Sequence, residues 1–375
     1  MNNAKELKLC VYAICKNESK FVDRWVRALQ EEADCVVVLD TGSTDNTVEL
    51  LKQYEPFVTV KQYDYSKDGI FRFDKARNDS LKLVPFDTDI CVVLDLDQVP
   101  LKGWSKIIKE RFSEGYTEVY GYIVDHDENG NELNRWRSKN VHPNSPYYIW
   151  DKVIHEGIND YSGNKVKGIF DENFIINHYP DLHKDRGIYK DLLYYACKEH
   201  PEDSYYAIYL GIELAKYSKE ESANAFRRAL KECDFTNNSD IYYQTYINLA
   251  LSTDDTREAL DCLYSAEAIG EENNIKTRRL YVTFANIFEE KGEDDKAIDS
   301  LEKALAIQSN SNDWREDSKN FSGYIEDRLS LFYYYKKHNL LKAIEYSTKA
   351  LSLDPNNERM LNNLKFYYNS YINKR

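Results

Sequence analysis

Short, fully apolar runs alternate with amphipathic segments along the first part of the chain. The apolar runs, each expected to form a buried strand, span residues 7–15, 34–40, 57–65 and 89–97. The segments between them carry apolar residues at helical spacing and span residues 17–32, 46–54 and 73–84. Strands that are apolar on both faces and alternate with helices are typical of a mostly parallel sheet with helices on both sides. We therefore expect an α/β domain.

A polar turn, Asp-Glu-Asn-Gly at 127–130, separates two shorter segments with strand character, 117–124 and 132–137. This pattern predicts an antiparallel hairpin added to the sheet. The strand signal disappears near residue 185. We therefore predict one domain over residues 1–184 and a second, all-α domain over residues 185–375.

The second part of the chain repeats a helical pattern. Small residues recur seven positions apart in four segments, as Ser222/Ala229, Ala259/Ala266, Ala297/Ala304 and Ala343/Ala350. An aromatic-rich segment with helical character precedes each of them. Paired helices with small residues at fixed positions resemble tetratricopeptide repeats, whose period is about 34 residues. A plain helical bundle is the alternative, and the fixed register favours repeats.

Length and charge narrow the classes of protein to consider. A chain of 375 residues is long enough for two domains. It carries 50 Lys and Arg against 64 Asp and Glu, a net charge of -14. A general nucleic-acid binder needs cationic side chains to displace counterions from phosphates. We therefore expect no nucleic-acid partner.

The cysteines and the hydropathy pattern suggest a location. The seven cysteines form no Cys-x-x-Cys pair, and Cys10, Cys15, Cys35 and Cys91 fall in expected buried strands. This distribution argues against a disulfide framework or a zinc site. No apolar run is long enough for a membrane span, and the first residues lack the apolar core of a signal peptide. We expect a cytoplasmic protein without a membrane span.

Asp40 ends one of the apolar runs and opens the segment 40–47, Asp-Thr-Gly-Ser-Thr-Asp-Asn-Thr. Ligands of open α/β sheets bind where strands deliver their carboxyl ends. A carboxylate there can accept hydrogen bonds from a base or a ribose. The same residues are also good helix caps, so a capped turn without a ligand is the alternative.

Asp95 and Asp97 close the most strand-like run. Within a strand, positions i and i+2 point to the same face, so we expect both carboxylates to line one cleft. Two neighbouring negative charges need a cation or hydrogen-bond donors. Oxygen ligands suit Mg²⁺ or Mn²⁺.

Other polar residues stand beside these runs. Arg77 lies on the helix that enters the strand of Asp95, where it could neutralise a diphosphate or simply face solvent. Glu156 and His178 each follow an apolar run. A histidine after a strand is more often a structural group than a ligand.

Taken in order, six segments resemble an inverting glycosyltransferase of family 2 with the GT-A fold. They are 16–29, 36–51, 76–78, 92–100, 153–157 and 176–180. Together with the helical repeats, the chain is similar to the subgroup that joins this domain to tetratricopeptide repeats, which includes bacteriocin S-glycosyltransferases. The resemblance implies a UDP-sugar as donor. It also implies a peptide or protein acceptor that the repeats could engage.

The resemblance implies roles for the nucleotide-binding residues. Asp40 would hold the uracil–ribose end of the UDP-sugar, with Thr41 and Ser43 beside it, and Arg77 would lie near the nucleotide. Asp95 would contact the ribose or the donor sugar. By the same resemblance, Asp97 would hold Mn²⁺ or Mg²⁺, and His178 would complete the metal or diphosphate site.

The sequence departs from the family pattern at three positions. Asn46 replaces a usual Gly, a mild change because Asn tolerates the left-handed conformation. Arg72 stands where an Asp commonly precedes the Phe, and Gln98 replaces the usual Glu after the second Asp. The last two touch the expected donor pocket, so the identity of the sugar stays open.

We expect a one-step inverting transfer of a hexose or N-acetylhexosamine, in which a carboxylate takes the acceptor proton. Glu156 is the first candidate for this base and Asp151 the second, although Glu156 could also be a structural partner of His155. One alternative acceptor is a cell-surface or lipid-linked glycan. Another alternative is a non-catalytic repeat scaffold with a decayed nucleotide-sugar domain, against which the intact acidic motifs argue. Repeats can also bind a second copy, so a homodimer is conceivable.

Overall fold

The computed structural model describes residues 6–65, 69–181, 187–308 and 315–373. The chain divides into two units, Met1–Leu192 and Leu193–Arg375. The predicted boundary between residues 184 and 185 falls within 182–186, which lie outside the described residues. It stays a prediction, and each unit is taken by itself below.

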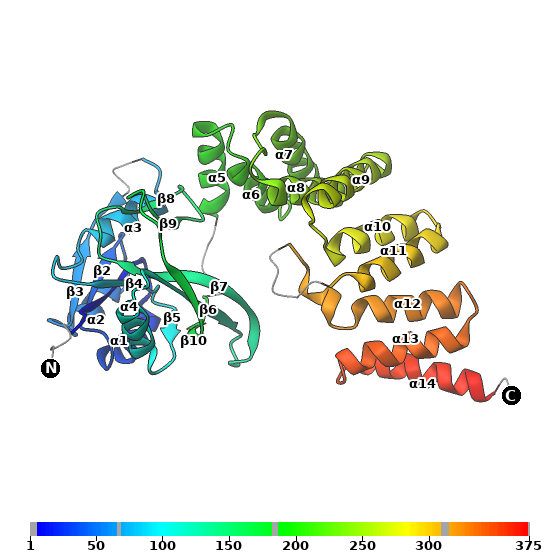
Figure 1. The fold of residues 1–375 in the computed structure, drawn as a ribbon, viewed down its shortest axis with the longest axis horizontal. Helices are drawn as coiled ribbons and strands as arrows, with labels where there is room; N and C mark the ends of the chain where they lie inside the picture. Colours follow the sequence, from blue (N-terminus) through cyan, green and yellow to red (C-terminus); the bar gives the residue numbers. More distant parts are fainter. Residues whose placement is uncertain (1–5, 66–68, 182–186, 309–314, 374–375) are drawn as a thin grey trace. The chain divides into compact units, whose positions relative to one another are not determined.

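The first unit is built on a curled sheet, drawn in blue to green in Figure 1. Within the described residues it has eight strands in the order β3-β2-β1-β4-β7-β6-β10-β5. β1 pairs in parallel with β2 and β4, β2 with β3, and β6 with β10. The strands are β1 Leu9–Cys15, β2 Cys35–Asp40, β3 Val58–Gln62, β4 Ile90–Val93, β5 Gln98–Pro100, β6 Glu118–His126, β7 Glu132–Pro143 and β10 Gly168–His178. The expected mostly parallel α/β sheet is thus confirmed.

Both faces of this sheet are covered, which explains its continuous apolar strands. The helices are α1 Ser19–Gln30, α2 Thr47–Lys52, α3 Phe73–Leu81 and α4 Trp104–Ser113. On α1, Phe21, Trp25 and Leu29 are buried at the predicted helical spacing. α1, α2 and α4 pack on one face of the sheet, together with Val11 and Val36. α3 and the small β8–β9 sheet (Tyr148–Asp151 and Gly157–Asp160) lie against the other.

The predicted hairpin exists, but it is not an addition to the sheet. β6 and β7 pair antiparallel, and β7 also pairs with β4, so the hairpin is inserted between the parallel strands. Val141 of β7 is fully buried between Val92 and Val119. The sequence pattern missed this because residues 138–143 mix polar and apolar positions. Through β7 and β6, β10 therefore belongs to the same sheet as β4.

Buried hydrogen bonds join three aromatic side chains, one of which, Tyr12, belongs to β1. Trp150 Nε1 donates to the Tyr12 hydroxyl, which lies 2.9 Å from His142 Nε2. His142 Nδ1 lies 2.9 Å from the Pro143 carbonyl oxygen, which can only accept. Nδ1 therefore carries the proton and Nε2 accepts from Tyr12, so His142 is neutral in the fold. Burial lowers the pKa of His142 to about 4.

This network predicts acid sensitivity of the first unit. Because the folded pKa of His142 is depressed, its contribution to stability is complete above the ordinary value of 6.5 and is lost as pH falls toward 4. We expect a cost of about 3 kcal/mol across that window. The free energy of unfolding, measured by urea unfolding at several pH values, should fall less steeply with decreasing pH for His142→Gln than for the wild type. The same pH dependence in variant and wild type would contradict the assignment.

The second unit consists of paired helices, drawn in green to red in Figure 1. The small residues of the repeat pattern are all buried where the helices cross. The boundary between the units falls inside α5 Ile188–Glu199. The helices that follow are α6 Ser204–Leu214, α7 Lys219–Glu232, α8 Ser239–Ser252, α9 Thr256–Asn273, α10 Arg278–Glu290, α11 Asp294–Ala306, α12 Tyr324–Tyr335, α13 Leu340–Leu353 and α14 Glu358–Ile372, with a short 3₁₀ turn at Ser318–Phe321. The expected helical repeats are confirmed. Nowhere in the described ranges is a helix both long and apolar enough to span a bilayer.

Candidate functional site

The carboxyl ends of β1, β2 and β4 meet at one edge of the sheet because these strands are parallel. β6 and β10 run in the same direction as β4, since β7 is antiparallel to both β4 and β6 and β10 is parallel to β6. Asp125 and His178, a register pair on β6 and β10, therefore reach this edge as well. Most of the predicted site residues lie along it.

Asp40 forms a closed turn at the end of β2. It is fully buried, and its Oδ1 accepts from the backbone N–H groups of Gly42 and Ser43, both at 3.1 Å. Gly42 supplies the turn with a φ of 108°, which favours glycine. Thr41 is buried and donates its hydroxyl to the Cys15 carbonyl at the end of β1. The nucleotide contacts predicted for Asp40 and Thr41 stay predictions beside this structural role.

Ser43 links the loops that follow β1 and β2. Its Oγ accepts from the backbone N–H of Asn17 at 2.8 Å, and Asn17 Oδ1 accepts from the Thr44 N–H at 2.7 Å. The two loops are thus held as one surface beside the sheet edge. Asn46, by contrast, has a φ of -84°, so the left-handed conformation invoked for this position is not needed.

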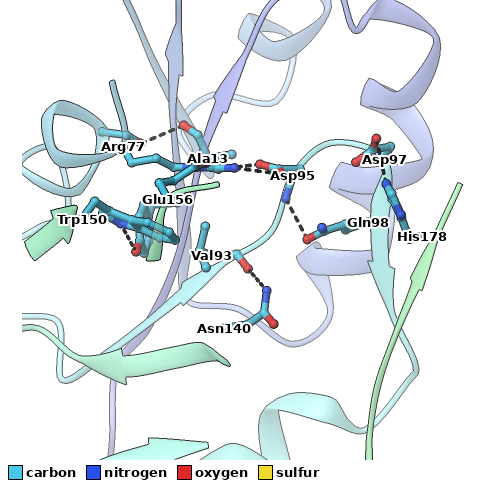
Figure 2. Close-up of polar contacts among 12 residues, drawn as sticks. Ala13, Arg77, Val93, Asp95, Asp97, Gln98, Asn140, Trp150, Glu156 and His178 are labelled. Atoms are coloured by element: carbon cyan, nitrogen blue, oxygen red, sulfur yellow. Dashed lines mark hydrogen bonds and ion pairs between the residues drawn. The ribbon is translucent and has the colours of Figure 1, made fainter. Parts of the chain in front are cut away.

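Arg77 is the centre of an ion-pair cluster. From α3 it donates two hydrogen bonds to Asp95, at 2.5 and 2.9 Å, and its Nε donates to Glu156 Oε1 at 3.1 Å. Figure 2 shows Asp95 and Glu156 converging on Arg77 from two different loops. The surface-helix alternative for Arg77 is therefore wrong, because only 10% of its side chain is exposed.

The charge balance of this cluster explains its stability. Burial alone would lower the pKa of Arg77, but the charges and hydrogen bonds of Asp95 and Glu156 outweigh it and raise that pKa. Bidentate pairing with Asp95 uses the planar fork of the guanidinium. Glu156 thus contacts Arg77 rather than serving as a partner of His155 alone.

Asn78, the next residue along α3, fixes the position of Arg77. Its side chain accepts from the Trp150 N–H at 3.0 Å and donates to the Trp150 carbonyl at 2.8 Å. This double contact docks β8 on α3. The Trp150 ring then lies under the guanidinium, whose carbon is 5.4 Å from the ring centroid.

Asp95 and Asp97 do not share one face of a strand, as the sequence predicted. β4 ends at Val93, and both carboxylates follow in a turn. Figure 2 shows Asp95 directed at Arg77, while Asp97 lies on the other side beside His178. The turn is braced by Gln98, whose Oε1 accepts from the Asp95 N–H at 3.2 Å. A bend after Val93 replaces the strand geometry on which that prediction depended.

His178 bridges two carboxylates. Its Nε2 lies 3.2 Å from Asp97 Oδ2 and its Nδ1 lies 2.6 Å from Asp125 Oδ1. Burial lowers the pKa of His178, but the hydrogen bonds and charges of Asp97 and Asp125 raise it above the ordinary value overall. With a proton on Nδ1 for Asp125, Nε2 and Asp97 Oδ2 face each other as two acceptors, so a cation between them is required.

That cation is either a second proton or a metal ion. An oxygen and a nitrogen donor suit Mn²⁺, and such ions commonly take one or two protein ligands plus substrate phosphates. Asp125 would be the carboxylate that orients the ligating histidine. Across the described residues, three or more potential ligands do not gather at one point. The donor set therefore fits a metal that a substrate helps to hold.

Asp151, the second candidate base, lies at the end of β8. Its Oδ2 accepts from Asn159 Nδ2 at 3.1 Å and from the Tyr161 hydroxyl. Its Oδ1 is buried without a partner in the described part of the chain. It does not join the ion pairs of Arg77.

Two further residues near the site were missed by the sequence analysis. Asp125 ends an apolar run, as Asp40 does, so the same strand-end signal could have found it. Asn140 on β7 donates to the Val93 carbonyl at 3.0 Å, directly before the turn of Asp95. Nothing in the sequence marks Asn140, because its role depends on β7 lying beside β4.

Arg72 is the residue before α3 that departs from the family pattern. It forms two hydrogen bonds with Asp74 in the first turn of that helix.

Comparison with known families agrees with this description. Residues 10–181 match the family described as Glycosyl transferase family 2, and residues 279–311 match a Tetratricopeptide repeat. The first match covers less than half of the chain but nearly all of the sheet-bearing unit. That unit therefore carries a glycosyltransferase domain, and the expected enzyme class is confirmed. No curated protein matches the sequence.

Solved structures show only weak overall likeness. The S. aureus TarS 1-349 complex with UDP-GlcNAc is 12% identical and has a TM-score of 0.40, covering 78% of this chain and 89% of its own. MamA is 18% identical at a TM-score of 0.36, covering 46% and 93%. TTC0263, a thermophilic tetratricopeptide protein of Thermus thermophilus, is 20% identical at a TM-score of 0.33, covering 48% and 91%.

Proposed function

We propose that this chain, a glycosyltransferase by its family 2 domain, moves a hexose or N-acetylhexosamine from a UDP-sugar to an acceptor with inversion at the anomeric carbon. The observation that carries the proposal is the pair of polar clusters after β4. Arg77 with Asp95 and Glu156 lies on one side of the turn, and Asp97 with His178 lies on the other. Both lie within the region of the family match.

The two clusters suit a nucleotide-sugar differently. Asp95 presents a carboxylate that is 36% exposed and held by Arg77, so it can accept hydrogen bonds from sugar or ribose hydroxyls. Arg77 adds positive charge near a leaving diphosphate, which favours departure. Asp97 and His178 would hold Mn²⁺ or Mg²⁺, which when bound supplies further neutralisation of diphosphate charge.

Glu156 is the base that we favour. Its Oε1 accepts a hydrogen bond from Arg77 Nε, and within the described residues its Oε2 accepts none. That second oxygen is available for the acceptor proton. Asp151 stays the second candidate, since its Oδ1 is unpaired within the described ranges.

Glu156→Gln should reduce sugar transfer by about 10²–10⁴-fold, the usual contribution of a positioned base. The amide can still accept from Arg77 Nε, so UDP-sugar binding should change little. Calorimetric titration with the UDP-sugar and a radiolabel transfer assay would separate these two effects. Asp151→Asn is the matched variant, and a larger loss there than in Glu156→Gln would transfer the assignment to Asp151.

The acceptor is the least constrained part of the proposal. We favour a peptide or protein side chain, engaged with the help of the helical repeats, because the sequence resembles the subgroup that joins the two kinds of domain. Incubation of the full chain with labelled UDP-sugars, Mn²⁺ and either a peptide library or glycan acceptors tests this choice. Label on glycans alone would favour the cell-surface or lipid-linked alternative. A cytoplasmic location and a homodimer stay predictions.

A further inference from the structure

The loop that carries Glu156 has an unusual backbone. It spans residues 152–156 and joins the last residue of β8 to the first residue of β9. Two of its residues are in the left-handed conformation, with a φ of 70° at Lys152 and 54° at His155. Residues other than glycine rarely adopt this conformation, because their Cβ atom crowds the backbone. The loop therefore places two uncommon backbone turns beside a residue of the candidate site.

The middle of this loop is anchored in the protein. Val153 and Ile154 are both buried. The Val153 carbonyl accepts a hydrogen bond at 3.2 Å from the backbone N–H of Phe73, the first residue of α3. The same helix carries Arg77. The loop is thus fixed to the helix that supplies the arginine of the ion-pair cluster.

His155 lies between this anchor and Glu156. The His155 side chain is exposed, and its ring meets the Tyr189 ring edge-on, with the two centroids 6.3 Å apart. Glu156, one position further on, is directed back into the protein. Only 13% of its side chain is exposed, and its Oε1 accepts from Arg77 Nε at 3.1 Å. The left-handed turn at His155 therefore sets the direction in which the Glu156 side chain leaves the loop.

We propose that His155 is a positioning residue for Glu156 and acts through its backbone conformation rather than through its imidazole. The inference rests on the proposed role of Glu156 as the base of sugar transfer. Glycine adopts the left-handed conformation freely, and histidine and asparagine tolerate it better than most residues, whereas β-branched residues are genuine outliers there. A β-branched residue at position 155 turns the chain away from this conformation and removes Glu156 from Arg77. A small misplacement of a reacting group costs much of its catalytic effect.

Urea unfolding of the full chain, followed by tryptophan fluorescence, tests the position of Glu156 without a measurement of activity. In the wild type, Glu156→Ala should raise the equilibrium constant of unfolding by at least about tenfold, because the buried Arg77 loses one partner. His155→Gly keeps the left-handed turn, so Glu156→Ala should have the same effect in that background. In His155→Val the contact is already lost, and the effect should be less than about threefold. An equal effect in all three backgrounds would overturn the proposal.

Sugar transfer distinguishes the backbone of His155 from its side chain. With a labelled UDP-sugar and Mn²⁺, His155→Gly and His155→Asn should stay within about threefold of the wild-type rate. His155→Val should lose at least about tenfold in kcat, with little change in the KM for the donor. A tenfold loss in the Gly and Asn variants as well would show that the imidazole is required, and this result does not depend on the Val variant folding. Full transfer by Glu156→Gln would instead remove the base assignment, while the unfolding comparison still decides whether His155 positions Glu156.

His338 provides a matched control. It is also exposed, has a φ of 51°, and lies in the loop between α12 and α13 of the second unit. His338→Val should strain the backbone in the same way. It should leave both the transfer rate and the effect of Glu156→Ala on unfolding unchanged. A loss of transfer as large as that of His155→Val would mean that any strained loop lowers activity, and would remove the specific role of His155.

Discussion

Replacing Asp97 with Asn is expected to reduce sugar transfer by about 10²–10³-fold, the usual loss when one preorganised charged group is removed from a site. Asp97 is the carboxylate that faces His178 Nε2 at 3.2 Å. In the wild type, Asp97 Oδ2 and His178 Nε2 are two acceptors that require a cation between them. The substitution replaces this carboxylate with a neutral amide. We therefore also expect a much weaker dependence of the remaining activity on Mn²⁺. The measurement is transfer rate against Mn²⁺ concentration at saturating donor.

Two comparisons make this result specific. Asp87→Asn removes a surface carboxylate that pairs with Lys8, and transfer should stay unchanged. Asp125→Asn keeps Asp97 but weakens the orientation of His178, so a smaller loss is expected. An Asp97→Asn enzyme with the wild-type rate and the wild-type Mn²⁺ dependence would remove Asp97 from the proposed role.

The parts of the fold predicted from sequence are those whose signal is local. Both faces of the sheet are covered, so the strands Leu9–Cys15 and Cys35–Asp40 are apolar at nearly every position. Their burial can therefore be predicted without knowing which segments pack against them. The buried alanines of the repeats, such as Ala259 and Ala297, likewise recur because helices cross at fixed points.

The parts that could not be predicted depend on contacts between distant segments. Glu156 is 79 positions from Arg77, and only the docking of β8 on α3 brings them together. Asp95 and Asp97 point in opposite directions because the chain turns after Val93, where β4 ends. From the sequence pattern alone, this turn looks the same as a continuation of the strand. The sequence therefore locates polar residues at or just after strand ends, while their pairing depends on the topology.

Arg77→Met is expected to have the second large effect, on stability as well as on transfer. Removing the guanidinium leaves Glu156, with 13% of its side chain exposed, and Asp95, with 36% exposed, without their shared partner. Breaking a buried ion pair costs about 3–5 kcal/mol, and the partial exposure of Asp95 places the expected loss near the lower end, about 3 kcal/mol. Urea unfolding followed by tryptophan fluorescence reports mainly on the first unit, because four of the five tryptophans lie there.

The cause of this loss can be separated from the loss of packing. Arg135→Met removes a half-buried arginine that pairs with the exposed Glu132, and should change the unfolding free energy by less than about 1 kcal/mol. Arg77→Met combined with Glu156→Gln removes one of the stranded charges, so the double variant should be more stable than Arg77→Met alone. Transfer should be lost in both, because neither retains the guanidinium near the diphosphate. A double variant less stable than the single would mean that packing of Arg77 against Trp150, rather than charge pairing, holds the cluster together.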